Sequence, residues 1–478
     1  MKTFARLVLA FTSLVAISAP TLRADALDDA IVALMQKRNV PGLSLAVVSE
    51  GKIVRARGYG VVEKGGSTPV TEDTLFQAGS ISKPVAAFGA LCLVEAGKLS
   101  LDDDVNAALK SWKVPENEFT ATEKITLRRL LSHTAGLTVH GFPGYPVGTA
   151  QPTLVQILNG EKPANTRAIR ADIAPDSRWR YSGGGYTVMQ QLVIDVTGRA
   201  YPDFMHDTVL KPLGMLASSY EQPLPPALAA KTATGHTQRM PVKGRWHIYP
   251  EMAAAGLWTT ASDLARFAIA VQQSVAGKPG SLLSKETAQL MVTPGKGGYG
   301  LGFSMSSSGA TQRFTHGGRD QGFDAQFIAY RETGQAAVVL INANENSSFM
   351  NRVMAAIGDH YGWPAYGPYT PPKPIEDTEP DITTQVKTIF ENARAGKYDK
   401  ALYSEKLAAI LEDQVPKPDS IAYLAGFGAF KSIQLVGKRV NDGNRSYRYF
   451  LVFENESVLL TCTYQADGKI GGLHFQPE

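Results

Sequence analysis

The residues around position 80 decide how this chain folds and which chemistry it can carry. They read Phe76-Gln77-Ala78-Gly79-Ser80-Ile81-Ser82-Lys83. Residues 82–97 have apolar side chains at helical spacing, with Pro84 in the first turn and Gly97 as the stop, which predicts a buried helix. Ser80 and Lys83 are three residues apart, so the Lys83 ammonium can reach the Ser80 hydroxyl on one helix face.

A serine hydroxyl is a poor nucleophile until a base takes its proton. A desolvated lysine beside another cationic or phenolic group can be that base. The start of the helix also adds positive potential and free N–H groups at the place where an oxyanion would form. The spacing S-x-x-K also arises by chance, and by itself it indicates no more than a surface helix cap. The interpretation therefore depends on the segments that accompany Ser80 and Lys83.

Four more segments carry related patterns in chain order. They are Leu130-Leu131-Ser132-His133-Thr134-Ala135-Gly136-Leu137, Tyr181-Ser182-Gly183-Gly184-Gly185-Tyr186, Gly256-Leu257-Trp258-Thr259-Thr260-Ala261-Ser262-Asp263-Leu264 and His316-Gly317-Gly318. Together with Ser80 and Lys83 they resemble the serine β-lactamases, penicillin-binding peptidases and related esterases, and most of all the class C β-lactamase branch. The resemblance covers residues 27–361. It implies an α+β fold of the β-lactamase/DD-peptidase type, in which an antiparallel sheet flanked by helices adjoins a helical subdomain.

The same resemblance implies a catalytic group of Ser80, Lys83 and Tyr181. Tyr181 stands where the class C branch has the tyrosine of a Tyr-x-Asn motif. Two nearby cations would favour its phenolate, so we treat Tyr181 and Lys83 as one coupled base. The edge strand expected to bind substrate consists of His316, Gly317, Gly318 and Arg319. The N–H of Arg319 is expected to join that of Ser80 as an oxyanion hole.

Two positions depart from the family pattern. Gly183 replaces the asparagine of Tyr-x-Asn, whose amide helps to hold an acylamino side chain; we expect the glycine run to form a tight turn rather than to widen the site. His316 replaces the lysine of Lys-Thr-Gly. Because imidazole is mostly neutral at pH 7, we hypothesise that His316 gives carboxylate-bearing substrates a binding preference for mildly acidic pH.

Several other polar residues have structural interpretations. We expect His133 to support a helix and turn near the site, and Asp263 to cap or begin the following helix. The acidic run Asp102-Asp103-Asp104 is interpreted as a solvated loop rather than a cation site. The nucleophile elbow G-x-S-x-G is absent from the sequence, which disfavours an α/β-hydrolase.

Composition limits the classes of partner. The 478 residues carry a formal net charge of +4, which is too little to indicate a nucleic-acid partner. The histidines and the two cysteines lack the spacing of metal ligands, so we predict no metal and no cofactor. Cys92 and Cys462 fall in different predicted domains and are expected to be buried thiols rather than a disulfide.

Residues 1–26 have the features of a secretory signal peptide. Lys2 and Arg6 form a basic region, an apolar stretch follows, and Ala24-Asp25-Ala26 matches a cleavage site, with cleavage expected after Ala26. No later stretch has the roughly 20 consecutive apolar residues of a membrane helix. We therefore predict a periplasmic or secreted protein without a membrane span.

The remaining chain divides into three parts. Residues 27–365 form the expected hydrolase domain, with strands at 43–48, 53–59, 314–316, 324–330 and 336–341. Residues 366–380 contain Pro371-Pro372-Lys373-Pro374 and predict a stiff linker. Residues 381–478 predict a small α+β domain with helices at 382–396 and 399–411 and strands at 447–453, 458–464 and 470–475. This unit resembles nuclear-transport-factor-2-like (NTF2-like) domains in its helix-then-strand order. Its role is open between a lid, a dimerisation or cell-wall module and a stabilising appendage.

The expected reaction is attack of Ser80 on an ester or amide carbonyl, followed by hydrolysis of the acyl-enzyme by water. Three substrate classes stay open: short-chain or aryl esters, D-amino-acid peptides or amides, and β-lactams. The two departures favour an ester or peptide hydrolase over a class C-like β-lactamase. A penicillin-binding sensor or non-catalytic binding protein is the alternative from another class, and the intact Ser80, Lys83 and Tyr181 argue against it. The sequence leaves the oligomeric state open.

Overall fold

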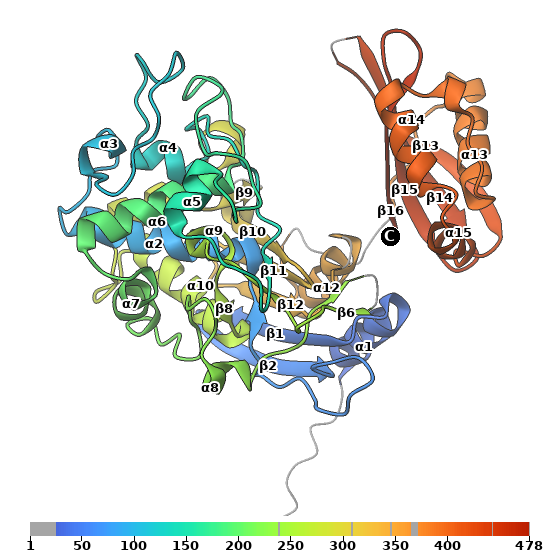
Figure 1. Cartoon of the computed structure of the whole chain (residues 1–478). Helices are drawn as coiled ribbons and strands as arrows, with labels where there is room; N and C mark the ends of the chain where they lie inside the picture. Colours follow the sequence, from blue (N-terminus) through green and yellow to red (C-terminus); the bar gives the residue numbers. More distant parts are fainter. Residues whose placement is uncertain are drawn as a thin grey trace, which may run out of the picture.

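The computed structural model describes residues 25–237, 240–306, 309–344, 347–364, 371–441 and 443–477 (Figure 1). Its largest sheet has six antiparallel strands in the order β2-β1-β12-β11-β10-β9. They are β1 (Gly42–Ser49), β2 (Lys52–Gly60), β9 (Ser304–Ser306), β10 (Arg313–Asp320), β11 (Phe323–Tyr330) and β12 (Ala336–Ile341). The five strands expected from the sequence in this part of the chain all lie in this sheet, and β9 is an additional edge strand.

Strand β1 is buried on both faces, and its alternate residues contact different layers. Leu45 and Val47 pack with α1 (Ala26–Arg38) and α12 (Ser347–His360), which cover one face of the sheet. Ala46 belongs instead to the larger core on the opposite face. The sheet is therefore the middle layer between two hydrophobic cores, which explains its continuous apolar sequence.

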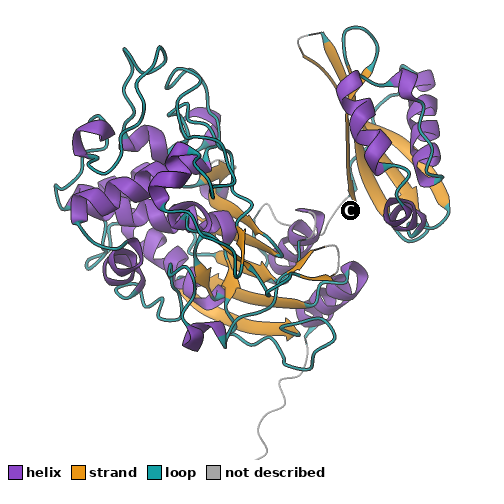
Figure 2. Ribbon diagram, viewed as in Figure 1, coloured by secondary structure: helices purple, strands orange, loops and turns teal. Residues whose placement is uncertain are grey.

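The other helices of this part lie beyond the opposite face of the sheet (Figure 2). They are α2 (Ser82–Glu95), α3 (Val105–Ala108), α4 (Leu127–Leu131), α5 (Leu154–Asn159), α6 (Gly183–Thr197), α7 (Tyr201–Met205), α8 (Pro226–Ala229), α9 (Met252–Ala255), α10 (Ala261–Val275) and α11 (Lys285–Met291). Three two-stranded ladders lie among them, formed by β3 (Phe76–Gln77) with β8 (Trp258–Thr259), β4 (Tyr145–Pro146) with β7 (His247–Ile248), and β5 (His236–Thr237) with β6 (Met240–Pro241). The predicted α+β class and the helical, loop-rich middle section are confirmed.

The C-terminal part has its own sheet and its own hydrophobic core. Its strands are β13 (Phe430–Asn441), β14 (Asn444–Phe453), β15 (Ser457–Tyr464) and β16 (Ile470–Pro477), and its helices are α13 (Pro380–Arg394), α14 (Glu405–Gln414) and α15 (Pro418–Ala425). The sequence analysis missed β13 and α15. Leu435 is the one buried residue of β13, so this strand carries a weak alternating pattern.

The predicted domain boundaries fall partly outside the described residues. This holds for residues 1–24 of the expected signal peptide and for 365–370 at the start of the expected linker, whereas 371–379 contain no helix or strand.

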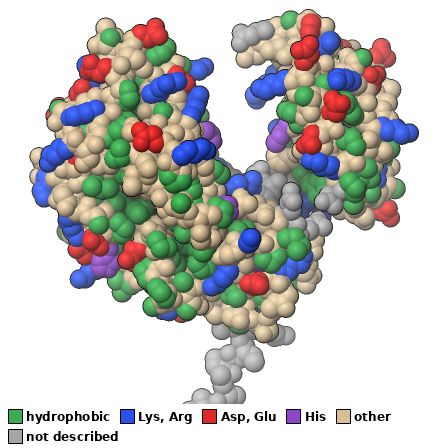
Figure 3. Space-filling view, viewed as in Figure 1, with side chains coloured by type: hydrophobic (Ala, Val, Ile, Leu, Met, Phe, Trp, Pro, Cys, Tyr) green, Lys and Arg blue, Asp and Glu red, His purple; other side chains and the backbone are tan. Residues whose placement is uncertain are grey.

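The two parts of the chain touch where Arg38 Nη1 donates to Glu456 Oε2 at 2.5 Å. Within the described residues, no helix has both the length and the apolar character needed to cross a bilayer. Lys, Arg, Asp and Glu side chains are interspersed over the face seen in Figure 3.

Candidate active site

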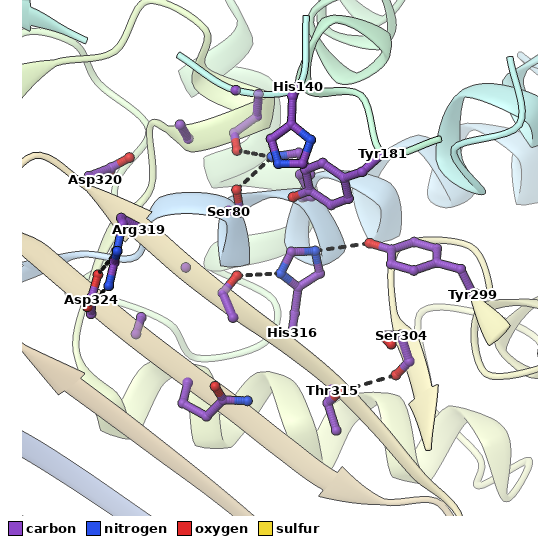
Figure 4. Close-up of a pocket in the computed structure, with 18 of the residues that line it drawn as sticks. Ser80, His140, Tyr181, Tyr299, Ser304, Thr315, His316, Arg319, Asp320 and Asp324 are labelled. Carbon is purple, nitrogen blue, oxygen red and sulfur yellow. Dashed lines mark hydrogen bonds and ion pairs between the residues drawn. The ribbon is translucent and has the colours of Figure 1, made fainter. Parts of the chain in front are cut away.

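Ser80 lies in a short 3-10 helix (Gly79–Ile81) that runs directly into α2 (Figure 4). The Nζ atom of Lys83 is 2.9 Å from Ser80 Oγ, and it donates a second hydrogen bond to the backbone oxygen of Ala254 at 2.7 Å. Lys83 is 1% exposed, so its amine is almost completely withdrawn from bulk water. The predicted contact between Ser80 and Lys83 across one helix face is therefore present. The surrounding protein encloses the Lys83 side of this contact.

Burial lowers the pKa of Lys83 to about 7, against the smaller opposing effect of the Asp320 carboxyl. A buried ammonium loses its hydration, so the neutral amine becomes accessible near pH 7. A neutral amine at hydrogen-bond distance from a hydroxyl can accept its proton. The pair can therefore generate a serine nucleophile at neutral pH.

Tyr181 precedes the N-cap of α6, and its hydroxyl shares a hydrogen bond with Ser80. Lys83 Nζ lies 5.0 Å from the centroid of the Tyr181 ring. Burial raises the pKa of Tyr181 above its ordinary value, and the hydrogen bond with Ser80 offsets this only in part. The phenol therefore keeps its proton at neutral pH, which corrects our expectation that nearby cations favour the phenolate. In this geometry Lys83 can accept a proton and Tyr181 can donate one.

The backbone of β10 lies against the turn that carries the nucleophile. A Cβ atom on Gly79 would come within 2.4 Å of the Arg319 nitrogen, and one on Gly318 within 1.9 Å of the Ala78 oxygen. Gly79 also has a φ of 52°, and its N–H donates to the Asp320 carboxyl. This close approach needs both glycines, and it brings the Arg319 backbone beside the Ser80 turn, as the expected oxyanion hole requires.

His316 is buried and hydrogen-bonded through both ring nitrogens. Its Nδ1 is 2.6 Å from the oxygen of Gly317, and its Nε2 is 3.0 Å from the hydroxyl of Tyr299. Burial, and then the charge of Lys83, lower the pKa of His316 to about 3. The ring is therefore neutral in mildly acidic solution, and our hypothesis that its titration there controls carboxylate binding is wrong for this site.

Gly183 is the first residue of α6 and does not form the predicted tight turn. A Cβ atom there would come within 3.0 Å of both the His140 oxygen and the Phe142 ring. The loop that contains His140 therefore fills the space beside Gly183, and it brings the His140 ring to the pocket (Figure 4). The sequence analysis missed His140, because a single histidine in a loop has no distinguishing pattern.

His133 and Asp263 make the contacts of structural residues, as expected. His133 is buried, and its Nδ1 accepts the Ser182 N–H at 3.1 Å. Asp263 lies in the first turn of α10 and accepts hydrogen bonds from the Ala217 N–H and the Ser218 hydroxyl.

Cys92 and Cys462 are free thiols. Across the described residues, no three His, Cys, Asp or Glu side chains are grouped as metal ligands.

One pocket of about 910 Å³ collects the predicted site residues. Its lining includes Ser80, Lys83, Tyr181, His316, Gly317, Gly318 and Arg319. Phe142, Trp179 and Tyr299 add aromatic surface. On the opposite side Arg319 makes a two-pronged ion pair with Asp324, with both N–O distances at 2.6 Å. The structure thus brings all seven residues together, while their roles in catalysis and binding remain a prediction.

Comparison with known proteins shows the family of the chain. The β-lactamase family model matches residues 27–359. The chain belongs to the β-lactamase family. Within that family it is similar to penicillin-binding protein 4 of Amycolatopsis lactamdurans, with 27% identity over 72% of this chain and 93% of that protein.

Two solved structures share the fold. The octameric penicillin-binding protein homologue from Pyrococcus abyssi has a TM-score of 0.58 and 21% identity, covering 94% of this chain and 95% of that one. The β-lactamase/D-alanine carboxypeptidase from Pseudomonas syringae has a TM-score of 0.56 and 21% identity, covering 70% and 99%. This β-lactamase-family chain is therefore of the serine hydrolase and penicillin-binding protein type, with the fold that the sequence predicted.

Proposed function

We propose that this chain is an exported serine hydrolase that cleaves ester or peptide bonds through an acyl-enzyme on Ser80. The observation that carries the proposal is the distance of 2.9 Å between Lys83 Nζ and Ser80 Oγ, at a lysine whose pKa burial lowers to about 7. A structural lysine would keep its charge and an ion-pair partner. Here the nearest atoms are a hydroxyl and a backbone carbonyl, which suit an amine that exchanges a proton.

The reaction follows from the contacts. Lys83 takes the proton of Ser80 as Oγ attacks the carbonyl carbon, and the backbone N–H groups of Ser80 and Arg319 hold the oxyanion. The proton then passes through Lys83 or Tyr181 to the leaving oxygen or nitrogen. Water subsequently hydrolyses the ester formed on Ser80. This chemistry uses side chains and backbone groups of the protein alone.

The substrate proposal rests on what the pocket offers. The loop beside Gly183 leaves no room for an amide side chain, and the neutral His316 offers no cation to a substrate carboxylate. Both features weaken the binding of β-lactams and favour short-chain or aryl esters and D-amino-acid peptides as substrates. The relatives named penicillin-binding proteins support a second candidate, a class C-like β-lactamase or a penicillin-binding sensor.

Rapid-quench intact mass measurement tests the proposal. The full chain and its Ser80→Ala variant are mixed separately with a penicillin and with p-nitrophenyl acetate. A transient adduct with turnover of the ester on the unmodified chain alone supports the proposal. A stable penicillin adduct supports the sensor, and turnover of penicillin supports the β-lactamase. Equal ester hydrolysis by the Ser80→Ala variant would reject the acyl-enzyme.

A further inference from the structure

Three histidines surround the ring of Tyr181, and His140 is the only exposed one among them. The ring centroids of His133, His140 and His316 lie 4.2, 4.9 and 6.1 Å from that of Tyr181. His133 is 2% exposed and accepts a backbone N–H, and His316 is tied through both nitrogens. His140 is exposed and lines the pocket beside Ser80 (Figure 4).

The ring nitrogens of His140 have no hydrogen-bond partner within the described part of the chain. Burial, and then the charge of Lys83, lower the pKa of His140 below its ordinary value. The ring is therefore neutral at pH 7 and has a lone pair for a proton. The titratable side chains next to it are Lys83, Tyr181 and His133, and none of them is a carboxylate that would raise its pKa.

The backbone of His140 is held by the same helix that follows Tyr181. The N–H of Gly183 donates to the His140 oxygen, and the N–H of Gly184 donates to the Val139 oxygen, both at 3.0 Å. The hydroxyl of Ser182 donates to the Thr138 oxygen at 2.9 Å. These contacts fix the loop relative to Tyr181. The glycines allow the close approach, because a Cβ on Gly184 would lie 2.5 Å from the Thr138 oxygen.

Lys83 and His140 both line the pocket that contains Ser80, but they differ in exposure. Lys83 is enclosed, and its nitrogen already contacts Ser80 Oγ and the Ala254 oxygen. Water that attacks an acylated Ser80 must enter from the open pocket, where His140 is exposed. A base for that water is useful only if it is neutral and reaches the open side of the pocket. His140 meets both conditions.

We propose that His140 is a catalytic residue of the second half-reaction, the general base that activates the water which hydrolyses the acyl-enzyme on Ser80. This inference rests on the proposed function. The water oxygen bonds to the carbonyl carbon as its proton passes to an imidazole nitrogen of His140. The tetrahedral oxyanion stays on the backbone N–H groups of Ser80 and Arg319. The bond from carbon to Oγ then breaks, Oγ takes the phenol proton of Tyr181, and the proton on His140 restores that phenol.

The test separates acylation from deacylation. The unmodified chain and the variants His140→Gln and His140→Ala are mixed with p-nitrophenyl acetate, and quenched samples give the formation and decay rates of acetyl-Ser80. His474→Gln is the control, because His474 is an exposed histidine on the C-terminal sheet. General acid–base catalysis typically contributes about 10²–10⁴-fold. We expect decay to slow by about 100-fold in both His140 variants while formation changes little, and added imidazole to restore decay in His140→Ala.

Two results would overturn the inference. Slower formation of acetyl-Ser80 with unchanged decay would make His140 a substrate contact instead. Unchanged formation and decay in both variants would remove it from the reaction altogether. Failure of the proposed function looks different, because the unmodified chain would then form no acetyl-Ser80 at all. In that case the inference falls with it.

Discussion

The Nε2 atom of His316 lies 3.0 Å from the hydroxyl oxygen of Tyr299, although the two residues come from different elements of the chain. Its Nδ1 lies 2.6 Å from the Gly317 oxygen, and the Tyr299 hydroxyl also donates to the Gly302 oxygen at 3.1 Å. Burial disfavours the charged imidazolium, and the nearby charge of Lys83 disfavours it further. Burial therefore makes the residue that replaces the family's lysine a neutral part of the pocket wall rather than a cation.

His316 should therefore stay neutral across the range in which histidines usually titrate. With its pKa lowered to about 3, we expect no chemical-shift change of its ring signals between pH 5 and 8 in histidine-labelled protein, assigned with His316→Gln. A shift with a midpoint near pH 6 would contradict the buried, doubly bonded ring. The same variant should leave the shape of the activity profile between pH 5 and 6 unaltered.

Activity should rise with pH as Lys83 loses its proton. The neutral amine is the reactive form, so its fraction increases about tenfold per pH unit below the pKa and levels off above it. Because the pKa of Lys83 is lowered to about 7, we expect kcat/KM for a neutral ester to climb between pH 5.5 and 7 and to flatten by pH 8. An inflection near the ordinary lysine value of about 10 would show that the amine is not desolvated in solution.

Gly183→Ala should destabilise the protein and disturb the pocket. Its Cβ would press on the His140 oxygen and the Phe142 ring, both 3.0 Å away, and such overpacking typically costs about 1–3 kcal/mol. Thermal unfolding and ester kinetics measure the two effects. The matched control is Gly185→Ala in the same helix, where the nearest atoms are 3.7 Å away. There the gain in helix propensity of up to about 1 kcal/mol should stabilise the chain. Equal melting temperatures for the two variants would contradict the tight fit at Gly183.

Glu456 should hold the C-terminal part against the hydrolase domain. Its side chain and that of Arg38 are each about nine-tenths buried where they pair, and Lys37 lies 3.4 Å from the same carboxylate. Removing one partner of a buried ion pair typically costs about 3–5 kcal/mol, because the other charge stays buried. We expect Glu456→Gln to speed proteolysis within residues 371–379, most of which are exposed. Cleavage at the rate of the unmodified chain would show that other contacts hold the two parts together.

Asp25 should remain in the mature form of the proposed exported protein, which moves the expected cleavage site. Its carboxylate caps α1 and pairs with Arg55, and its N–H donates to Asp28 Oδ2 at 3.3 Å. The bond with Arg55 holds the pKa of Asp25 below its usual range. Cleavage after Ala26 would remove this cap, whereas cleavage after Ala24 would retain it. Intact mass of the exported chain should place its first residue at Asp25, and Asp25→Ala should cost about 1 kcal/mol of stability. A mature chain that begins at Leu27 would contradict this.

The sequence determined the features that depend on local spacing. Ser80 and Lys83 meet because three residues along a helix bring side chains to one face. The sheet strands were predictable because β1 and β12 are continuous apolar runs, whereas β13, with one buried residue, was not. The order of the five signatures then indicated the family and the fold.

Only the tertiary structure decided how those residues behave chemically. The pKa of Lys83 depends on enclosure by α9, about 170 positions away in the sequence, and the neutrality of His316 depends on its burial and on the charge of Lys83. His140 faces the pocket because Gly183, 43 positions later, leaves space for its loop. Burial and proton affinity are set by neighbours in space, and a single sequence does not state which distant residues those neighbours are.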